Sequence, residues 1–101
     1  MPSKSATDTY IPVTIMVPRW EVAEVSATGP LTLTVTFVDG TTGIVRFKPT
    51  HLYGIFAPLA DPAFFEKVHV ADGAVAWPGD IDLAPDAMYD EIKARGEWVL
   101  A

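Results

Sequence analysis

The fold of this chain is decided by the stretch Trp77-Pro78-Gly79-Asp80-Ile81-Asp82-Leu83-Ala84-Pro85-Asp86-Ala87-Met88-Tyr89. A strand ends at its tryptophan, a tight acidic turn follows, and a helix begins with a proline. We expect that helix over residues 85–95, because Gly96 follows as a typical C-terminal cap. Apolar residues recur along it at the spacing of a core-facing stripe: Ala84, Ala87, Met88 and Ile92.

Upstream, residues 31–37 alternate strictly between apolar residues and threonines, which predicts a strand with one buried face. Asp39-Gly40 turns this strand into the next. A two-residue loop would place Arg46 on the core face, whereas a loop of odd length with a glycine bulge places Val45 and Phe47 there. We therefore predict the bulged hairpin.

A second hairpin is expected around Asp72-Gly73. Here a simple two-residue turn places Val70 on the same face as Val75 and Trp77, so no bulge is needed. Between the hairpins we expect a packed loop over residues 51–59. A short helix should follow, with Asp61 as its N-cap.

The remaining chain completes an α+β domain with a mostly antiparallel sheet of two β-hairpins plus an N-terminal strand, on which the short central helix and the C-terminal helix pack. Residues 1–18 are expected to be a lead with a possible edge strand at residues 11–17, and a further strand starts near Trp20. Residues 19–96 make a single domain, and residues 97–101 are expected to be a C-terminal tail.

Composition excludes several classes of function. The 101 residues contain no cysteine, which removes disulfides and thiolate nucleophiles. Thirteen acidic against seven basic residues give a net charge of −6, which disfavours direct binding to nucleic acid or to an anionic membrane. No signal peptide or membrane span is recognisable, so we expect a cytoplasmic protein. An apolar fraction of 50% predicts a homo-oligomer.

The sequence resembles a bacterial small-protein family called domain of unknown function 2442. The resemblance runs from about Trp20 to Tyr89, and its distinctive motif is Trp77-Pro78-Gly79-Asp80-Ile81-Asp82-Leu83-Ala84-Pro85. It implies a compact α+β domain without an established activity, often encoded beside another small protein as toxin and antitoxin pairs are. Some members continue into a helix-turn-helix region, which we expect to be missing here because the sequence stops at Ala101. Met88 stands where the family leads us to expect leucine.

No catalytic constellation, cofactor-binding motif or metal site can be assembled from the residues. Asp80 and Asp82 could offer oxygens to a cation, but their surroundings do not continue as a calcium loop, and a turn and a helix start explain them better. His51 and His69 are candidate general bases without a nucleophile near them in the sequence. We therefore expect no enzyme, no cofactor and no metal.

Two functional hypotheses remain. The first is a non-enzymatic, antitoxin-like interaction module that presents an acidic turn and helix to a small basic protein. Its expected protein-binding residues are Trp77, Asp80, Asp82, Asp86 and Tyr89. The second is a small-molecule-binding or enzymatic domain with a site near Asp80 and Asp82, joined by His69. A concave pocket in which these three converge would favour it. A purely structural oligomer formed through residues 11–17 is a third alternative.

Overall fold

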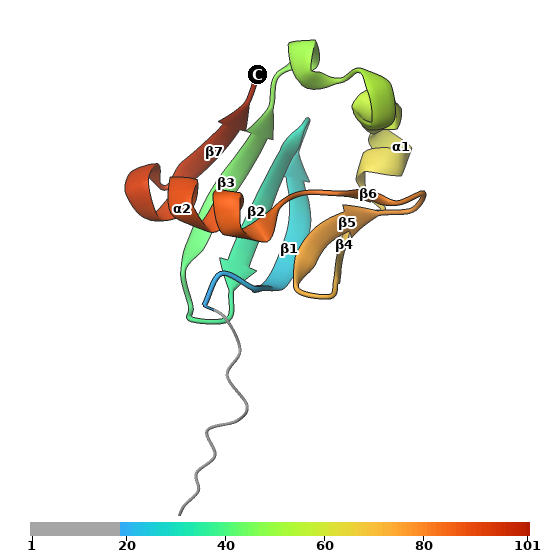
Figure 1. Cartoon of the computed structure of the whole chain (residues 1–101). Coiled ribbons are helices and arrows are strands. Elements are labelled where there is room, and N and C mark those ends of the chain that lie inside the picture. Colours follow the sequence, from blue (N-terminus) through green and yellow to red (C-terminus); the bar gives the residue numbers. More distant parts are fainter. Residues whose placement is uncertain (1–18) are drawn as a thin grey trace, which may run out of the picture.

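Two β-sheets and four short helical segments make up the computed structural model, which describes residues 19–101 (Figure 1). The larger sheet is mixed, and its strands follow the order β1 (Val22–Gly29), β2 (Thr32–Phe37), β3 (Thr42–Phe47) and β7 (Glu97–Leu100). The smaller sheet is antiparallel and contains β4 (His69–Ala71), β5 (Ala74–Trp77) and β6 (Ile81–Asp82). The helical segments are the 3₁₀ helices η1 (Pro49–His51) and η2 (Gly54–Ala60) and the α-helices α1 (Pro62–Phe65) and α2 (Pro85–Arg95).

This architecture confirms the expected α+β class, but the strands divide into two sheets where one was expected. The sheets meet at the start of β1, where the Val22 amide donates to the Gly73 carbonyl oxygen at 2.8 Å. The expected edge strand at residues 11–17 lies outside the described residues.

The loops of both predicted hairpins have the expected lengths, odd in the first and even in the second. In the first, Leu33 faces Val45, and the Phe37 amide donates to the Thr41 carbonyl oxygen, which leaves a three-residue loop in which Gly40 has a φ of 90°. This is the odd-length, glycine-containing turn that the burial of Val45 requires.

The second hairpin closes with the two-residue turn Asp72-Gly73, as expected. Val70 faces Val75, and the turn residues have φ values of 51° and 77°. Two successive positive φ angles are the signature of a turn whose twist matches that of the flanking strands. Val75 is fully buried, so the simple turn delivers it to the core.

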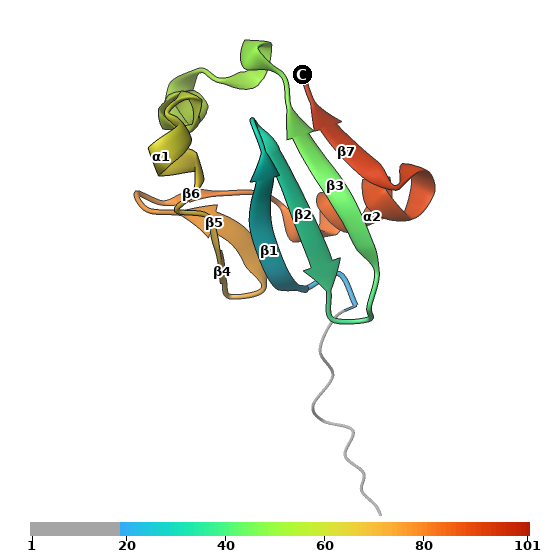
Figure 2. The ribbon, with the colours of Figure 1, turned by 180° about the vertical axis from the view of Figure 1, so that it is seen from behind.

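Helix α2 covers the inner face of the larger sheet, and Figure 2 shows the opposite face without a helix over it. Met88 and Ile92, which lie one helical turn apart on α2, are the buried residues of this helix. Ala84 and Ala87, which were expected to share this core spacing, are exposed. Ala84 is the extended N-cap residue, and Ala87 precedes Met88 by one position, which turns it about 100° away from the buried stripe.

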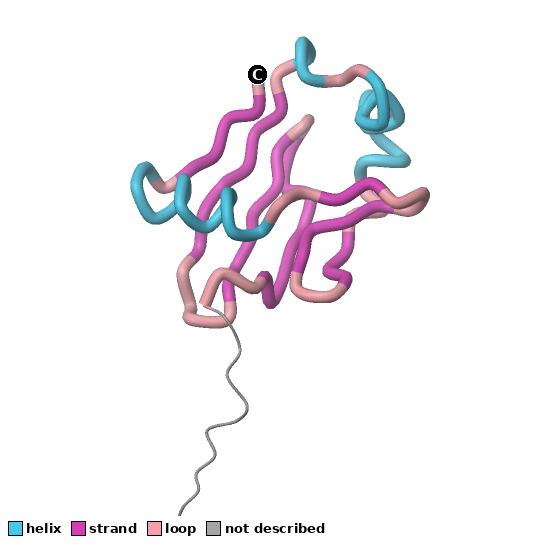
Figure 3. The backbone as a smooth tube through the Cα atoms, in the orientation of Figure 1, coloured by secondary structure: helices cyan, strands magenta, loops and turns pink. Residues whose placement is uncertain are grey.

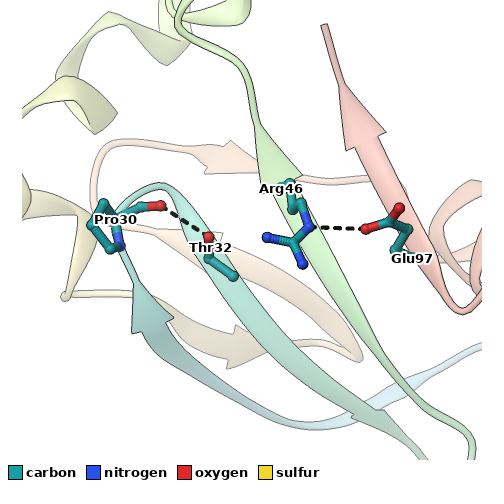
Figure 4. Close-up of polar contacts among 4 residues, drawn as sticks. All are labelled: Pro30, Thr32, Arg46 and Glu97. Carbon is teal, nitrogen blue, oxygen red and sulfur yellow. Dashed lines mark hydrogen bonds and ion pairs between the residues drawn. The ribbon is translucent and has the colours of Figure 1, made fainter.

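The uncovered face of the larger sheet is mostly polar, although Ile44 and Val99 also lie on it. Threonines of β2 lie on it, and the Thr32 hydroxyl donates to the Pro30 carbonyl oxygen at 2.9 Å (Figure 4). An ion pair between Arg46 and Glu97, with Nε and Oε1 2.9 Å apart, links β3 to β7. Both side chains are about half exposed, so this pair contributes little, on the order of 0–1 kcal/mol.

Two segments differ from expectation. Residues 97–101 were expected to be a tail, but β7 pairs in parallel with β3, and the Lys48 amide donates to the Leu100 carbonyl oxygen at 2.8 Å. Gly96, with a φ of 81°, ends α2 and redirects the chain alongside β3.

Within residues 51–59, where a packed loop was expected, the chain coils into η2 (Figure 3). Helix α1 begins as expected, since the Asp61 side chain accepts a hydrogen bond from the Ala63 amide.

Candidate functional site

An acidic groove runs along the outer face of the smaller sheet. Strand β5 is central, so Ala76 faces His69 of β4 on one side and Asp82 of β6 on the other. The two alanines of β5 have small side chains, which leaves a hollow of about 500 Å³ between the flanking strands. Its polar lining residues are His69, Asp72, Asp80 and Asp82. We call this hollow the acidic groove.

The turns at the two ends of β5 place carboxylates at both ends of the groove. Asp72 lies in the turn before β5 and Asp80 in the turn after it, with φ values of 51° and 63°. Aspartate tolerates this left-handed backbone better than most residues, because its short side chain can hydrogen-bond locally. The aspartates that suit the β4–β5 and β5–β6 turns thus also give the groove its negative charge.

The groove carboxylates have no basic partner within residues 19–101. The ion pairs of that region are Arg46–Glu97 and Arg95–Glu91, and neither involves a groove residue. His69 is exposed, and its Nδ1 lies 3.1 Å from the Lys67 carbonyl oxygen. A carbonyl can only accept, so this bond requires the proton on Nδ1 and makes Nε2 the acceptor of the neutral ring.

Trp77, which is one of the five residues expected to bind a partner, is buried in the core. Although it belongs to the groove lining, its side chain is only 2% exposed. The indole Nε1 donates to the Phe65 carbonyl oxygen at 2.8 Å, and the ring meets that of Phe47 edge-on at 6.0 Å. A buried tryptophan whose N–H is satisfied inside the core stabilises the fold and offers no contact surface.

Tyr89 likewise has an intramolecular partner. Its hydroxyl donates to Asp39 Oδ2 at 2.6 Å, and its ring meets Phe37 edge-on at 5.1 Å. This hydrogen bond joins α2 to the turn between β2 and β3. Sequence reasoning assigned Asp39 only to the turn, and its partner lies 50 positions away, so no local signal could have found the pair.

The hydrogen bonds around Asp39 stabilise the ionised form of its carboxyl group. The Tyr89 hydroxyl and the Thr41 amide lower the pKa of the Asp39 carboxyl from its ordinary value of 3.8 to about 2. Conversely, donation to Asp39 raises the pKa of the Tyr89 hydroxyl. Both shifts come from a contact between α2 and the β2–β3 turn, and neither Asp39 nor Tyr89 lines the groove.

Asp86 lies beside the groove but does not line it. It is exposed, belongs to the first turn of α2, and accepts a hydrogen bond from the Ala87 amide at 2.9 Å. Its negative charge stabilises the N-terminal end of the helix dipole. Of the five residues expected to bind a partner, Asp80 and Asp82 are therefore the two that line the groove with carboxylates that have no side-chain partner within residues 19–101.

In the part of the chain from residue 19 onward, no group of three or more histidine, cysteine or acidic side chains is arranged to hold a metal ion. Within the same part, none of the helices combines the length and the apolar character that a bilayer crossing would need.

The comparisons with known proteins identify one relationship. No curated protein and no solved structure matches the chain. A family model described as "Protein of unknown function (DUF2442)" matches residues 22–94, which run from the start of β1 to one residue before the end of α2 and include every residue of the acidic groove. The match confirms the resemblance drawn from the Trp77–Pro85 motif, and the chain belongs to the DUF2442 family.

Proposed function

We propose that this protein is a non-enzymatic interaction module whose acidic groove receives a basic side chain of a small basic protein. The observation that carries the proposal is the placement of Asp80 and Asp82 beside an alanine floor, without a basic partner among the described residues. A long arginine or lysine side chain could lie over the alanines and place its charge between the carboxylates. Such complementarity favours one kind of partner and speeds association.

The role that we propose is antitoxin-like, in the cytoplasm, and it rests on the gene arrangement that the family resemblance implies.

We also propose that the protein forms a homo-oligomer. Two large apolar side chains support this part, because Tyr53 is 68% exposed and Ile55 is 64% exposed on neighbouring positions around the start of η2. Exposed apolar side chains that lie close together are typical of surfaces that meet another subunit.

The test is affinity capture of the tagged protein from its own cells, followed by mass spectrometry. We expect one small basic protein in stoichiometric amount. The variant Asp80→Asn/Asp82→Asn should lose it, while Glu24→Gln/Asp90→Asn, which removes the same charge at exposed positions outside the groove, should retain it. Capture that is unchanged in the first variant, or lost equally in both, would refute the proposal.

The alternative is a small-molecule-binding or enzymatic site in the same groove. The specific observation in its favour is that His69, Asp80 and Asp82 line one hollow. Native mass spectrometry of the protein purified from its own cells separates the two proposals. A bound small molecule that is absent from Asp80→Asn/Asp82→Asn supports the alternative, whereas a bound basic protein supports the interaction module.

A further inference from the structure

A second hollow, of about 610 Å³, lies between the β1–β2 turn and the segment formed by η2 and α1. It shares no lining residue with the acidic groove. Figure 2 shows the η2–α1 segment next to the end of the β1–β2 hairpin. The volume falls within the range of sites that hold small molecules, about 300–1,000 Å³. We call this hollow the apolar cleft.

The wall of the cleft is mostly hydrocarbon. Leu59 and Phe65 are buried core residues that form its base, and Leu31 and Leu52 are half-buried at its sides. Such a surface gains stability when an apolar body displaces water from it. The cleft therefore suits a ligand that is largely hydrocarbon.

The polar side chains of the cleft are few. The hydroxyls of Thr28 and Thr34 form a hydrogen bond of 3.0 Å, so Thr28 already has a partner within the sheet. Glu66 is the only charged residue that lines the cleft, and no basic residue of the described chain pairs with it. Its carboxylate disfavours an anionic ligand and favours a cationic one, in keeping with the net charge of −6.

Leu31 holds its side chain at the cleft in an unfavourable backbone geometry. Its φ is 51°, a left-handed value that glycine adopts freely and leucine rarely. The geometry is held in place because the Leu31 carbonyl oxygen accepts the Phe47 amide at 2.9 Å. A glycine would relieve the strain but would remove part of the cleft wall. Strain that a fold retains in this way is typical of binding sites.

We propose that the apolar cleft binds a small apolar molecule that carries an amine, with its hydrocarbon body against Leu31, Leu52 and Phe65 and its ammonium group beside Glu66. The cleft is separate from the acidic groove, so this site stands whether or not the groove binds a basic protein.

The experiment is a ¹H–¹⁵N NMR titration of the full chain with three probes that share one hydrocarbon body: hexylamine, hexanol and hexanoate. We expect shifts at the backbone amides of Leu31, Leu52 and Phe65, with hexylamine bound most tightly and hexanoate most weakly. Glu66→Gln should weaken hexylamine by about threefold to fivefold, the effect of an exposed ion pair, and leave hexanol unchanged. The control Glu24→Gln, at an exposed position outside the cleft, should change neither.

A second pair of variants tests the apolar wall. Leu31→Gly should weaken hexylamine and hexanol alike while the rest of the spectrum stays that of the folded protein. Should that variant fail to fold, Ala60→Phe, which adds bulk from an exposed position on the cleft, must weaken both probes in its place. The proposal is overturned by shifts confined to other surfaces, by hexanoate binding as tightly as hexylamine, or by equal effects of Glu66→Gln and Glu24→Gln.

Discussion

Gly43 is the position where the fit between α2 and the larger sheet can be tested most directly. It is buried in β3, and a Cβ atom there would lie 2.4 Å from Cγ2 of Ile92, 2.9 Å from Cγ1 of Ile92 and 3.0 Å from the Gly96 carbonyl oxygen. Ile92 is itself only 3% exposed, and the Gly96 oxygen accepts the Ile44 amide at 3.2 Å. Neither neighbour can move without losing packing or a hydrogen bond.

We expect Gly43→Ala to lower the free energy of unfolding by about 2 kcal/mol. Overpacking costs roughly 1–3 kcal/mol, and the close approach to both Ile92 carbons puts this site at the upper end of that range. The gain from replacing a strand glycine by alanine offsets about 0.5–1 kcal/mol of it. For a domain of this size, about 2 kcal/mol corresponds to a fall in Tm of roughly 10 °C. Urea denaturation followed by tryptophan fluorescence measures the change. Gly29→Ala is the control, because its Cβ would meet nothing closer than Thr32 at 3.7 Å.

A double-mutant cycle identifies the cause. Ile92→Ala removes both carbons that the new methyl group would strike, and alone it should cost about 3 kcal/mol through the cavity that it leaves. In the Gly43→Ala background the methyl group fills part of that cavity, so the double variant should also cost about 3 kcal/mol, where additive effects would give about 5 kcal/mol. Additive costs, or a Gly43→Ala variant as stable as the wild type, would refute the packing of α2 on β3 as described.

Three further predictions concern stability. Trp77→Phe removes the indole donor from the Phe65 carbonyl oxygen, which keeps the Val68 amide at 3.3 Å, and should cost about 0.5–1.5 kcal/mol in urea denaturation; a smaller cost would contradict the indole hydrogen bond. Gly96→Ala forces alanine to a φ of 81° and should cost about 1 kcal/mol, seen as a lower Tm; an unchanged Tm would show that the cap relaxes. The Asp39 pKa is lowered in the folded state, so its contribution to stability is present above about pH 4 and is lost as the pH falls toward 2; Tyr89→Phe should raise this pKa toward 3.8 in an NMR titration, and an unmoved pKa would contradict the pairing.

The features that the sequence predicts correctly are those set by neighbouring residues. Strict alternation over residues 31–37 defines the buried face of β2, and the side-chain phase across each turn decides whether its loop is odd or even. The limits of α2 follow from Pro85 at its start and Gly96 after its end. Each of these signals acts within a few residues, so an isolated sequence displays it.

The features that the sequence does not predict depend on distant partners. Strand β7 has only four residues, and its pairing with β3 joins segments more than 50 positions apart. Strand β6 has two residues, which is too short for any pattern to show. The acidic groove follows from the register that sets His69 and Asp82 on either side of Ala76, and that register exists only once β6 pairs with β5. The sequence could name Asp80, Asp82 and His69 as candidates for one site, but it could not show that the three residues line the same groove.

The same distinction decides which groove variants can be interpreted. Each of the other residues expected to bind a partner already has an intramolecular contact: the Trp77 indole donates to Phe65, the Tyr89 hydroxyl donates to Asp39, and Asp86 accepts from the first turn of α2. Substituting any of them perturbs folding before it perturbs binding, because a buried donor, an interelement bond or a helix start is lost with it. Asp80 and Asp82 have no such contact among the described residues, so their conversion to asparagine removes charge and leaves the fold's hydrogen bonds in place. Loss of a partner at these two positions therefore reports on recognition itself.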